Sequence, residues 1–333
     1  MARAYRGPVT EDPGAGLGRP GKRSRPRTKD RPDYSQADVG VVVAIDRGRY
    51  RCLVDDREVT AAKARTLGRK AVIVGDRVRL LGDVSGREGT LARIVEVEER
   101  RTVLRRTADD DSPHERPIVA NADQLAIVTA LADPTPRPGM IDRILVAGYD
   151  AGLEPLLVLT KADLASPDEI AAVYGPLGVR TVVCQPGADL GPLRELLAGR
   201  VSVLVGHSGV GKSTLVNALI PGVERVTGEV NAVTGKGKHT STSAVALRLP
   251  PPGGWVIDTP GVRSFGLSHV TVESVVAAFP DLAEIAEDCP RGCRHESGAV
   301  DCALDAAVAD HRLTADRLES FRRMERAWTT AAY

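Results

Sequence analysis

A glycine-rich segment in the second half of the chain constrains the fold more than any other feature. The segment Gly206-His-Ser-Gly-Val-Gly-Lys-Ser-Thr214 matches the pattern G-x-x-x-x-G-K-S/T. The apolar run 201–205 before it predicts a buried strand, and the apolar run 215–220 after it predicts the start of a helix. In that order, a strand, a glycine loop and a helix N-terminus form a cradle whose backbone N–H groups face an anion. The pattern therefore predicts a nucleoside triphosphate site in an α/β domain, rather than a glycine-rich turn with a chance lysine.

Two side chains of this phosphate loop have predicted chemical roles. We expect Lys212 to reach the β- and γ-phosphates, and the hydroxyl of Ser213 to bind Mg²⁺. The predicted nucleotide-binding residues of the loop are Gly206, His207, Ser208, Gly209, Val210, Gly211, Lys212, Ser213 and Thr214.

A second motif, Thr160-Lys161-Ala162-Asp163, follows the apolar run 156–159 and indicates which base is bound. A carboxylate at the end of a strand can accept hydrogen bonds from N1–H and from the exocyclic amine of guanine. Adenine lacks these donors in the same arrangement, so it would leave the carboxylate unpaired. The stem of Lys161 could cover one face of the base. Alone, the motif could be a turn in which Asp163 caps a helix, but beside a phosphate loop it predicts guanine binding by these four residues.

A third motif, Asp258-Thr-Pro-Gly261, follows the apolar run 255–257. We expect Asp258 to hold the Mg²⁺ shell and the N–H of Gly261 to contact a γ-phosphate. Between the phosphate loop and this motif, the run 235–242 is rich in glycine and hydroxyl groups. Such a run suits a segment that becomes ordered around a γ-phosphate and its metal, and it is equally compatible with a surface loop.

The order of the three motifs identifies a permuted domain. In an ordinary GTPase the phosphate loop comes first and the base-reading motif last, whereas here the base-reading motif precedes the phosphate loop. A doubly wound domain tolerates such a permutation because its termini lie at the surface, often close together. Over residues 36–325 the chain resembles the circularly permuted GTPases, most closely the ribosome small-subunit-dependent GTPase A family. The resemblance is carried by Asn121-Ala-Asp123-Gln124, Asp142-Arg143, Thr160–Asp163, Gly206–Thr214, Gly237-Lys-His239-Thr240 and Asp258–Arg263.

Two departures from the family pattern concern the base. The family usually has asparagine where Thr160 stands, so an amide contact near the base is lost or replaced by a hydroxyl. A short Ser-Ala type motif normally backs the guanine. The run 183–186 takes its place here, and it leaves that residue unassigned.

Catalysis departs from the Ras-like pattern as well. Val262 stands where Ras-like enzymes carry the glutamine that orients the attacking water, so unaided hydrolysis should be slow. The resemblance implies that His239 positions this water, although a lone histidine beside a lysine is also an ordinary surface residue. His239 and Lys212 are the predicted catalytic residues. The resemblance also implies an Mg²⁺-binding hydroxyl, which we assign to Thr240, with Ser241 as the alternative.

Three cysteines and a histidine near the C-terminus predict a metal site. Cys289, Cys293, His295 and Cys302 could form a closed, tetrahedral and structural Zn²⁺ site. In the family the first gap is usually one residue longer and the last gap one residue shorter. The alternatives are reduced cysteines or disulfides, and disulfides are disfavoured because nothing marks the chain as secreted.

The region before the GTPase domain predicts a small barrel. Turn residues separate five β-rich runs, which suggests an OB-fold. These runs are 41–44, 50–54, 71–74, 77–81 and 89–94. Over residues 36–106 Lys and Arg outnumber Asp and Glu, and Tyr50 is the only aromatic residue. We therefore expect contacts to the phosphates and shape of structured RNA rather than base stacking. The alternative is a barrel that only packs on the GTPase domain.

These observations predict an α/β protein: a permuted, doubly wound GTPase domain with an OB-like barrel before it and a small zinc domain after it. The expected parts are a disordered basic arm (1–35), the barrel (36–106), a linker (107–118), the GTPase domain (119–270) and a zinc-binding helical region (271–333) with an amphipathic helix near 313–328.

The motifs predict GTP hydrolysis, and the family resemblance, with the basic flanks, implies that it serves the assembly of the small ribosomal subunit. No apolar run approaches the ~18 residues that span a membrane, and the N-terminus lacks a signal-type core, so we expect a cytoplasmic protein without a membrane partner. We also expect a monomer that binds GTP or GDP, Mg²⁺, one structural Zn²⁺, and the subunit with its rRNA. One alternative is a GTP-gated RNA-binding switch in which hydrolysis is incidental. Another, RNA modification driven by GTP, is disfavoured because no second catalytic group of residues is visible.

Overall fold

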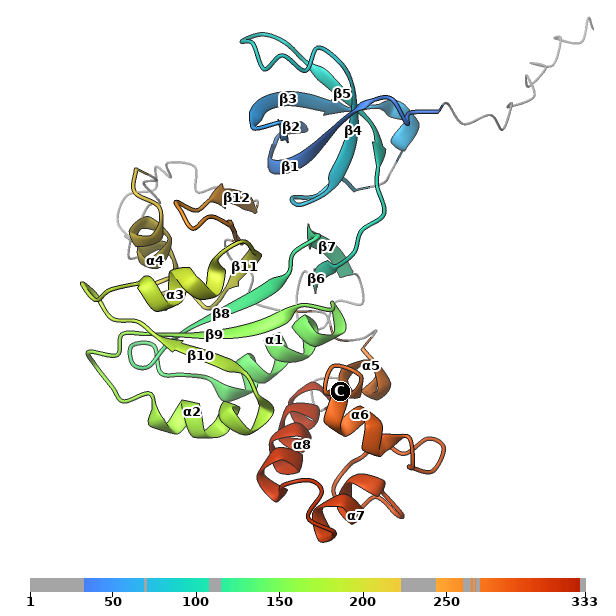
Figure 1. The fold of residues 1–333 in the computed structure, drawn as a ribbon, viewed down its shortest axis with the longest axis vertical. Coiled ribbons are helices and arrows are strands. Elements are labelled where there is room, and N and C mark those ends of the chain that lie inside the picture. The colour runs from blue at the N-terminus through green and yellow to red at the C-terminus, as the bar shows by residue number, and fades with distance from the viewer. Residues whose placement is uncertain are drawn as a thin grey trace, which may run out of the picture. The chain divides into compact units, whose positions relative to one another are not determined.

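The computed structural model describes residues 33–68, 71–107, 115–222, 244–259, 265, 267 and 270–329. The described residues from 36 onward form one compact unit, which is separate from residues 1–35. The larger unit contains a barrel, an α/β sheet and a helical C-terminal region (Figure 1). None of the helices in the described ranges combines the length and the apolar composition that crossing a bilayer requires. Most of the predicted basic arm lies outside the described residues.

Five strands form the predicted barrel. They are β1 (Asp38–Asp46), β2 (Arg49–Val54), β3 (Arg57–Lys63), β4 (Arg77–Gly82) and β5 (Ala92–Val97). β1 pairs with both β2 and β4, and β3 pairs in parallel with β5, so the sheet closes on itself. The first two hairpins are tight two-residue turns, because both central residues have positive φ angles: 44° and 80° at Arg47 and Gly48, and 45° and 65° at Asp55 and Asp56.

The third strand differs from the prediction. The apolar run 71–74 was expected to be a strand, but it forms only an isolated bridge between Val74 and Val119. Its place in the barrel is taken by β3, whose sequence is mostly polar and whose inward residues are Val59 and Ala61. The alternation of apolar inward and polar outward residues in β3 is hard to see in the sequence, because one of its two inward side chains is a single methyl group. A short helical turn (Arg65–Leu67) follows it.

The α/β region has a mainly parallel sheet with helices on both faces, as predicted. Its strands are β8 (Gln124–Ala130), β9 (Glu154–Thr160), β10 (Arg180–Val183), β11 (Val201–Val205), β12 (Val245–Arg248) and β13 (Trp255–Asp258), and β12 alone among them is antiparallel. Every residue of β8 is buried. Leu125 and Ile127 face one core with helix α1 (Pro138–Asp150), and Ala126 and Val128 face the other with α3 (Gly191–Leu197) and α4 (Lys212–Leu219). Burial on both faces is the mark of a doubly wound sheet.

The barrel and the α/β sheet share hydrogen bonds. β1 pairs with β12 at Ala44 and Val245, so the two sheets form one sheet of eleven strands in the order β10-β9-β8-β11-β13-β12-β1-β2-β3-β5-β4. Arg248 of β12 also binds Asp56 of the barrel.

Part of the predicted linker 107–118 is a strand. β6 (Val103–Thr107) and β7 (Glu115–Ala120) form an antiparallel pair, and residues 108–114 lie outside the described residues. The barrel packs closely on β7 at Gly75, where a Cβ atom would stand 1.9 Å from the carbonyl oxygen of Ala120. The side chain of Asn121 also donates to the carbonyl of Gly75 (2.9 Å). These contacts hold the end of β7 and the residue after it against the barrel.

The C-terminal region contains four helices: α5 (Val272–Val276), α6 (Pro280–Ala286), α7 (Ala303–Ala309) and α8 (Ala315–Thr329). The predicted amphipathic helix is α8, and it packs on α1 of the α/β region. Phe279 joins the two parts, since its ring contacts Tyr149 of α1 (4.6 Å) and Phe321 of α8 (5.8 Å). α2 (Asp168–Tyr174) and a helical turn (Gly175–Leu177) lie after β9.

A buried ion pair also fastens α8 to α1. Asp142 of α1 is 2% exposed, and its carboxylate accepts hydrogen bonds from Arg323 at 3.3 Å. The guanidinium of Arg323 lies 5.0 Å from the ring centre of Tyr174. Burial raises the pKa of Asp142, and Arg323 opposes that rise.

We expect the substitution Arg323→Ala to lower the free energy of unfolding by about 3 kcal/mol, because it leaves a buried carboxylate without its cation. The loss should shrink as the pH is lowered, since burial raises the pKa of Asp142 and the neutral carboxyl needs no cation. Urea unfolding at several pH values measures both effects. The matched control is Arg326→Ala, which removes an exposed pair with Glu319 and should cost ~0.5 kcal/mol or less. Equal losses in the two variants would contradict the prediction.

Candidate nucleotide site and metal centre

The phosphate loop joins β11 to α4, and its glycines are required by its geometry. Gly209 and Gly211 have φ angles of 85° and 89°, a region that disfavours other residues. A Cβ atom at Gly206 would stand 2.4 Å from the carbonyl oxygen of Val128 on the neighbouring strand. α4 begins at Lys212, three residues earlier than the apolar run suggested, so Ser213 also lies in its first turn. The helix N-terminus therefore faces the loop, as a phosphate site needs.

The three motifs meet at one edge of the sheet, because the carboxyl ends of parallel strands lie together. The register places Leu204, next to the phosphate loop, beside Asp258, and it places Ala130 beside Thr160. Asp258 is buried, and the hydroxyl of Thr259 donates to the carbonyl of Leu204 (2.7 Å). Those of the predicted phosphate, base and Mg²⁺ residues that the structure describes thus come from separate parts of the chain to the same edge of the sheet.

Thr160 connects the base-reading motif to the phosphate loop. Its hydroxyl lies 2.6 Å from the carbonyl oxygen of Val210 and 3.3 Å from that of Thr129, and the residue is 7% exposed. A hydroxyl, in place of the asparagine that the family resemblance leads us to expect, therefore faces the phosphate loop. Asp163 is exposed at the end of the motif, where a base could approach it.

We expect Thr160→Val to lower the affinity for guanine nucleotides about tenfold, because the isosteric side chain leaves the buried carbonyl of Val210 without its donor. Thr160→Ser keeps the hydroxyl and should bind nearly as tightly as the original protein. Titration with a fluorescent GDP analogue measures the difference. If the valine and serine variants bind alike, the hydrogen bond does not support the loop.

The segment expected to back the guanine lies beside the base-reading motif. The N–H of Ala162 donates to the carbonyl of Cys184 (3.3 Å), and the N–H of Cys184 donates to that of Leu159 (2.7 Å). The side chain of Cys184 is buried in the core, where burial raises the pKa of its thiol. The following residue, Gln185, is exposed. The thiol is thus unavailable to a base, and the residue that backs the guanine stays unassigned.

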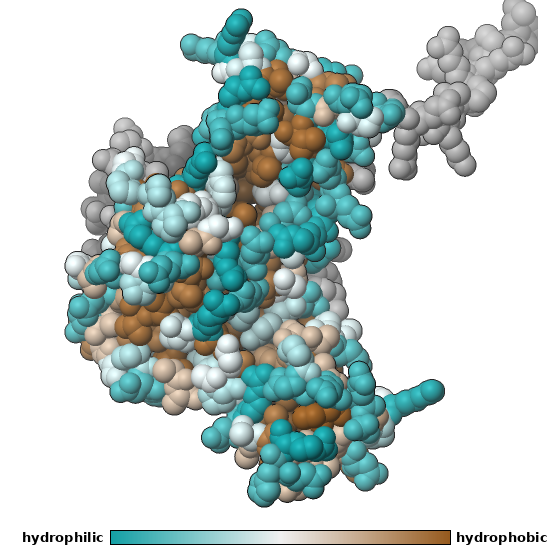
Figure 2. Space-filling view, in the orientation of Figure 1, coloured by the Kyte–Doolittle hydropathy of each residue, from teal (hydrophilic) through white to brown (hydrophobic). Residues whose placement is uncertain are grey.

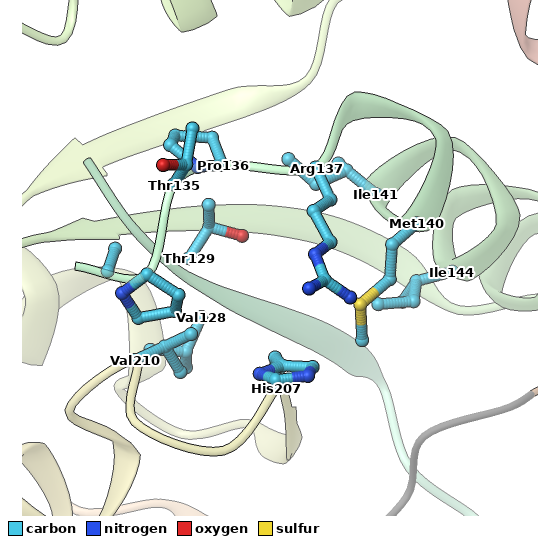
Figure 3. Close-up of a pocket in the computed structure, with 13 residues that line it drawn as sticks. Val128, Thr129, Thr135, Pro136, Arg137, Met140, Ile141, Ile144, His207 and Val210 are labelled. Carbon is cyan, nitrogen blue, oxygen red and sulfur yellow. The ribbon is translucent and has the colours of Figure 1, made fainter. Parts of the chain in front are cut away.

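A small, mostly apolar pocket adjoins the phosphate loop, and sequence reasoning did not find it (Figure 3). In Figure 3, Arg137 and Met140 come from the α1 side and His207 comes from the phosphate loop. Lys161 donates to the carbonyl of Asp133, which anchors the segment before α1. The lining residues are Val128, Thr129, Ala130, Pro134, Thr135, Pro136, Arg137, Met140, Ile141, Ile144, Gly206, His207 and Val210. In the sequence, the pair Asp133-Pro134 after β8 indicates a turn, and it is the signal that could have located this side of the pocket.

Several predicted site residues lie outside the described residues. They are His239, Thr240, Ser241, Gly261 and Val262.

The structure brings the four predicted metal ligands together. The Nδ1 atom of His295 lies 3.6 Å from the Sγ atoms of Cys289 and Cys293 and 3.8 Å from that of Cys302. A tetrahedral ion with bonds of about 2.3 Å to sulfur and 2.0 Å to nitrogen requires separations of about 3.5 Å between the nitrogen and each sulfur. All four ligand atoms lie within 4.8 Å of one another, so the set fits a metal ion.

The surroundings of the cluster also suit a metal. The N–H of Ala303 donates to the Sγ atom of Cys289 (3.2 Å), a contact that stabilises a thiolate. Burial lowers the pKa of His295, while Glu273 opposes this effect. The shift favours the neutral ring, which is the form that binds a metal.

Comparisons with known proteins show which family the chain resembles. Residues 97–268 match the family model described as RsgA GTPase. A Pseudomonas aeruginosa protein named small ribosomal subunit biogenesis GTPase RsgA is 43% identical over 216 residues, which cover 62% of this chain and 63% of that protein. That match thus spans less than two thirds of the relative. A protein of the same name from Chlorobaculum parvum is 38% identical over 293 residues, which cover 84% of this chain and 92% of that protein.

Two solved structures share the fold. YjeQ from Thermotoga maritima has a TM-score of 0.63 and 26% identity, with 86% of this chain and 96% of that chain covered. YloQ, described as a circularly permuted GTPase, has a TM-score of 0.63 and 22% identity, with 90% of this chain and 98% of that chain covered. The permuted motifs, the closed barrel, the metal cluster and these matches agree, and the chain belongs to the RsgA GTPase family.

Proposed function

We propose that this protein hydrolyses GTP during late assembly of the small ribosomal subunit, and that the subunit stimulates hydrolysis, which is coupled to release. The observation that carries the nucleotide part is the hydrogen bond from Thr160 to Val210, which joins the base-reading motif to the phosphate loop. The ribosomal part is supported by the relatives, whose names state small ribosomal subunit biogenesis. We also infer that the protein acts in the cytoplasm as a monomer.

The proposed reaction is in-line attack of water on the γ-phosphate. Lys212 stabilises the charge that develops on the phosphates, and Asp163 holds the guanine. Ser213, Thr240 and Asp258 would hold Mg²⁺, which neutralises charge on the β- and γ-phosphates when it is bound. Because Val262 cannot orient water, we assign that task to His239. We propose that His239 acts once the small subunit has ordered the run 235–242, which carries it.

We propose Zn²⁺ as the ion of the cluster. Three thiolates and one imidazole match the ligand preference of zinc. Four protein ligands leave no open position for a water, so the role of the ion is structural.

The barrel is the proposed rRNA-binding part. Arg47 and Arg49 are exposed at the tight turn between β1 and β2, and hydrophilic side chains gather along the edge of the barrel (Figure 2). Tyr50, the aromatic residue of the barrel, is partly buried, so it offers no open platform for base stacking. Arginines at such a turn suit contacts to phosphates.

The test is the rate of GTP hydrolysis with and without purified small subunits, with ATP as the control nucleotide. A large stimulation that is selective for GTP is expected. Full activity without subunits would remove the case for activation by the partner. If neither condition gives hydrolysis, the alternative of a GTP-gated RNA-binding switch is favoured. In that case His239→Ala should leave the rate of release from the subunit unchanged.

A further inference from the structure

Arg322 of α8 lies against the metal cluster without being one of its ligands. The residue is 7% exposed, which is unusual for an arginine. Its Nε–H donates to the carbonyl of His295 (2.8 Å), and Nη2 donates to the carbonyl of Glu296 (3.2 Å). The guanidinium therefore contacts the backbone of the ligand histidine and of the next residue.

The same guanidinium also holds the segment that carries the last ligand. Nη1 and Nη2 bind the two carboxylate oxygens of Asp305 at 2.8 and 2.7 Å. Asp305 lies in the first turn of α7, which begins directly after Cys302. One side chain thus connects the loop of His295 to the helix that follows Cys302, and it fastens both to α8.

The backbone of the ligand loop needs such support. His295 has a φ angle of 59°, in the left-handed region that residues other than glycine disfavour. The described chain has no helix or strand between the end of α6 at Ala286 and the start of α7 at Ala303. Hydrogen bonds within regular structure therefore do not hold His295 in place, whereas the bond from Arg322 acts directly on its peptide group.

The net charge of the metal cluster also favours a cation at the position of Arg322. Three thiolates, a neutral imidazole and a divalent ion carry a net charge of about −1. His295 and Cys302 are buried, so this charge is partly removed from water. A buried cation beside the cluster compensates it, and outer groups of this kind tune the affinity of metal sites.

We propose that Arg322 is a positioning residue of the metal centre: it fixes the backbone of His295 and joins the two ligand-bearing segments, so that the four ligands are arranged before the ion binds. The shape of the guanidinium is essential, because the three N–H donors of a lysine leave from a single nitrogen and cannot reach acceptors that lie around Nε, Nη1 and Nη2.

The test measures zinc affinity of the full chain by competition with a chromogenic chelator. We expect Arg322→Met to weaken zinc binding about 10- to 100-fold. Arg322→Lys keeps the charge and loses the fork, so its affinity should lie closer to the methionine variant than to the original protein. The matched control is Arg326→Met on the same helix, whose exposed side chain pairs with Glu319; its zinc affinity should not change.

A second readout separates positioning from general stability. With Co²⁺ in place of zinc, the absorption bands report the geometry of the thiolate and imidazole ligands. We expect shifted or weakened bands in Arg322→Lys and an unchanged spectrum in Arg326→Met. If Arg322→Met does not fold, Asp305→Asn provides the second variant, since it weakens the anchor of the guanidinium and leaves the arginine in place. The proposal is overturned if both Arg322→Lys and Asp305→Asn keep the zinc affinity and the cobalt spectrum of the unsubstituted protein.

Discussion

Asp163→Asn is expected to lower the affinity for GTP about 1,000-fold and to create affinity for xanthosine triphosphate. The carboxylate of Asp163 accepts two hydrogen bonds from guanine, from N1–H and from the exocyclic amine. The amide of asparagine offers one acceptor and one donor, so its NH₂ group would face the amine of guanine. Xanthine has an oxygen in place of that amine, and it therefore matches the amide.

Binding of both nucleotides is measured by displacement of a fluorescent analogue. The expected loss is smaller than the roughly 10⁴- to 10⁵-fold discrimination of buried polar sites, because Asp163 is exposed and water can reach the unmatched groups. Asp168→Asn is the matched control: this carboxylate is also exposed, lies five residues further on, and accepts a hydrogen bond from Ser166 (2.7 Å). The control should keep the preference for GTP. If the Asp163 variant keeps it as well, the base is recognised elsewhere.

Removal of the metal is expected to destabilise the C-terminal region by at least about 5 kcal/mol, because binding at a closed site contributes directly to folding. The segment between Ala286 and Ala303 lacks helices and strands, and both His295 and Asp301 in it have positive φ angles. The four ligands must therefore supply much of its order. Cys302→Ser, which keeps the size of the buried side chain, should have nearly the same effect as a chelator.

Hydrogen exchange measures this effect by region. In the chelated protein, amides of α7 and α8 should exchange much faster, while those of the barrel strands should change little. Added Zn²⁺ should restore protection in the original protein but not in Cys302→Ser. A chelator that also changed Cys302→Ser would be acting elsewhere, and unchanged exchange on chelation would show that the segment is ordered without an ion.

The fold class could be predicted from the sequence because the informative signals are local. The phosphate loop sits between a strand and a helix within a few residues, and its glycines adopt the positive φ angles that only their residue type favours. Cys289, Cys293 and His295 are likewise close in sequence, so their convergence needs only one turn of chain. The barrel was confirmed, although one strand was misplaced: apolar content marked the run 71–74, whereas hydrogen-bonded pairing decides what is a strand.

The sequence by itself determined the residue types of the phosphate loop, the order of the permuted motifs and the ligands of the metal cluster. The tertiary structure decided which distant groups meet them: the hydroxyl of Thr160 at the carbonyl of Val210, the pocket beside His207, and Arg322 at the backbone of His295. The physical reason is that backbone conformation and ligand spacing depend on neighbouring residues. Contacts between elements depend instead on how helices and strands pack, and packing is set by the whole core at once.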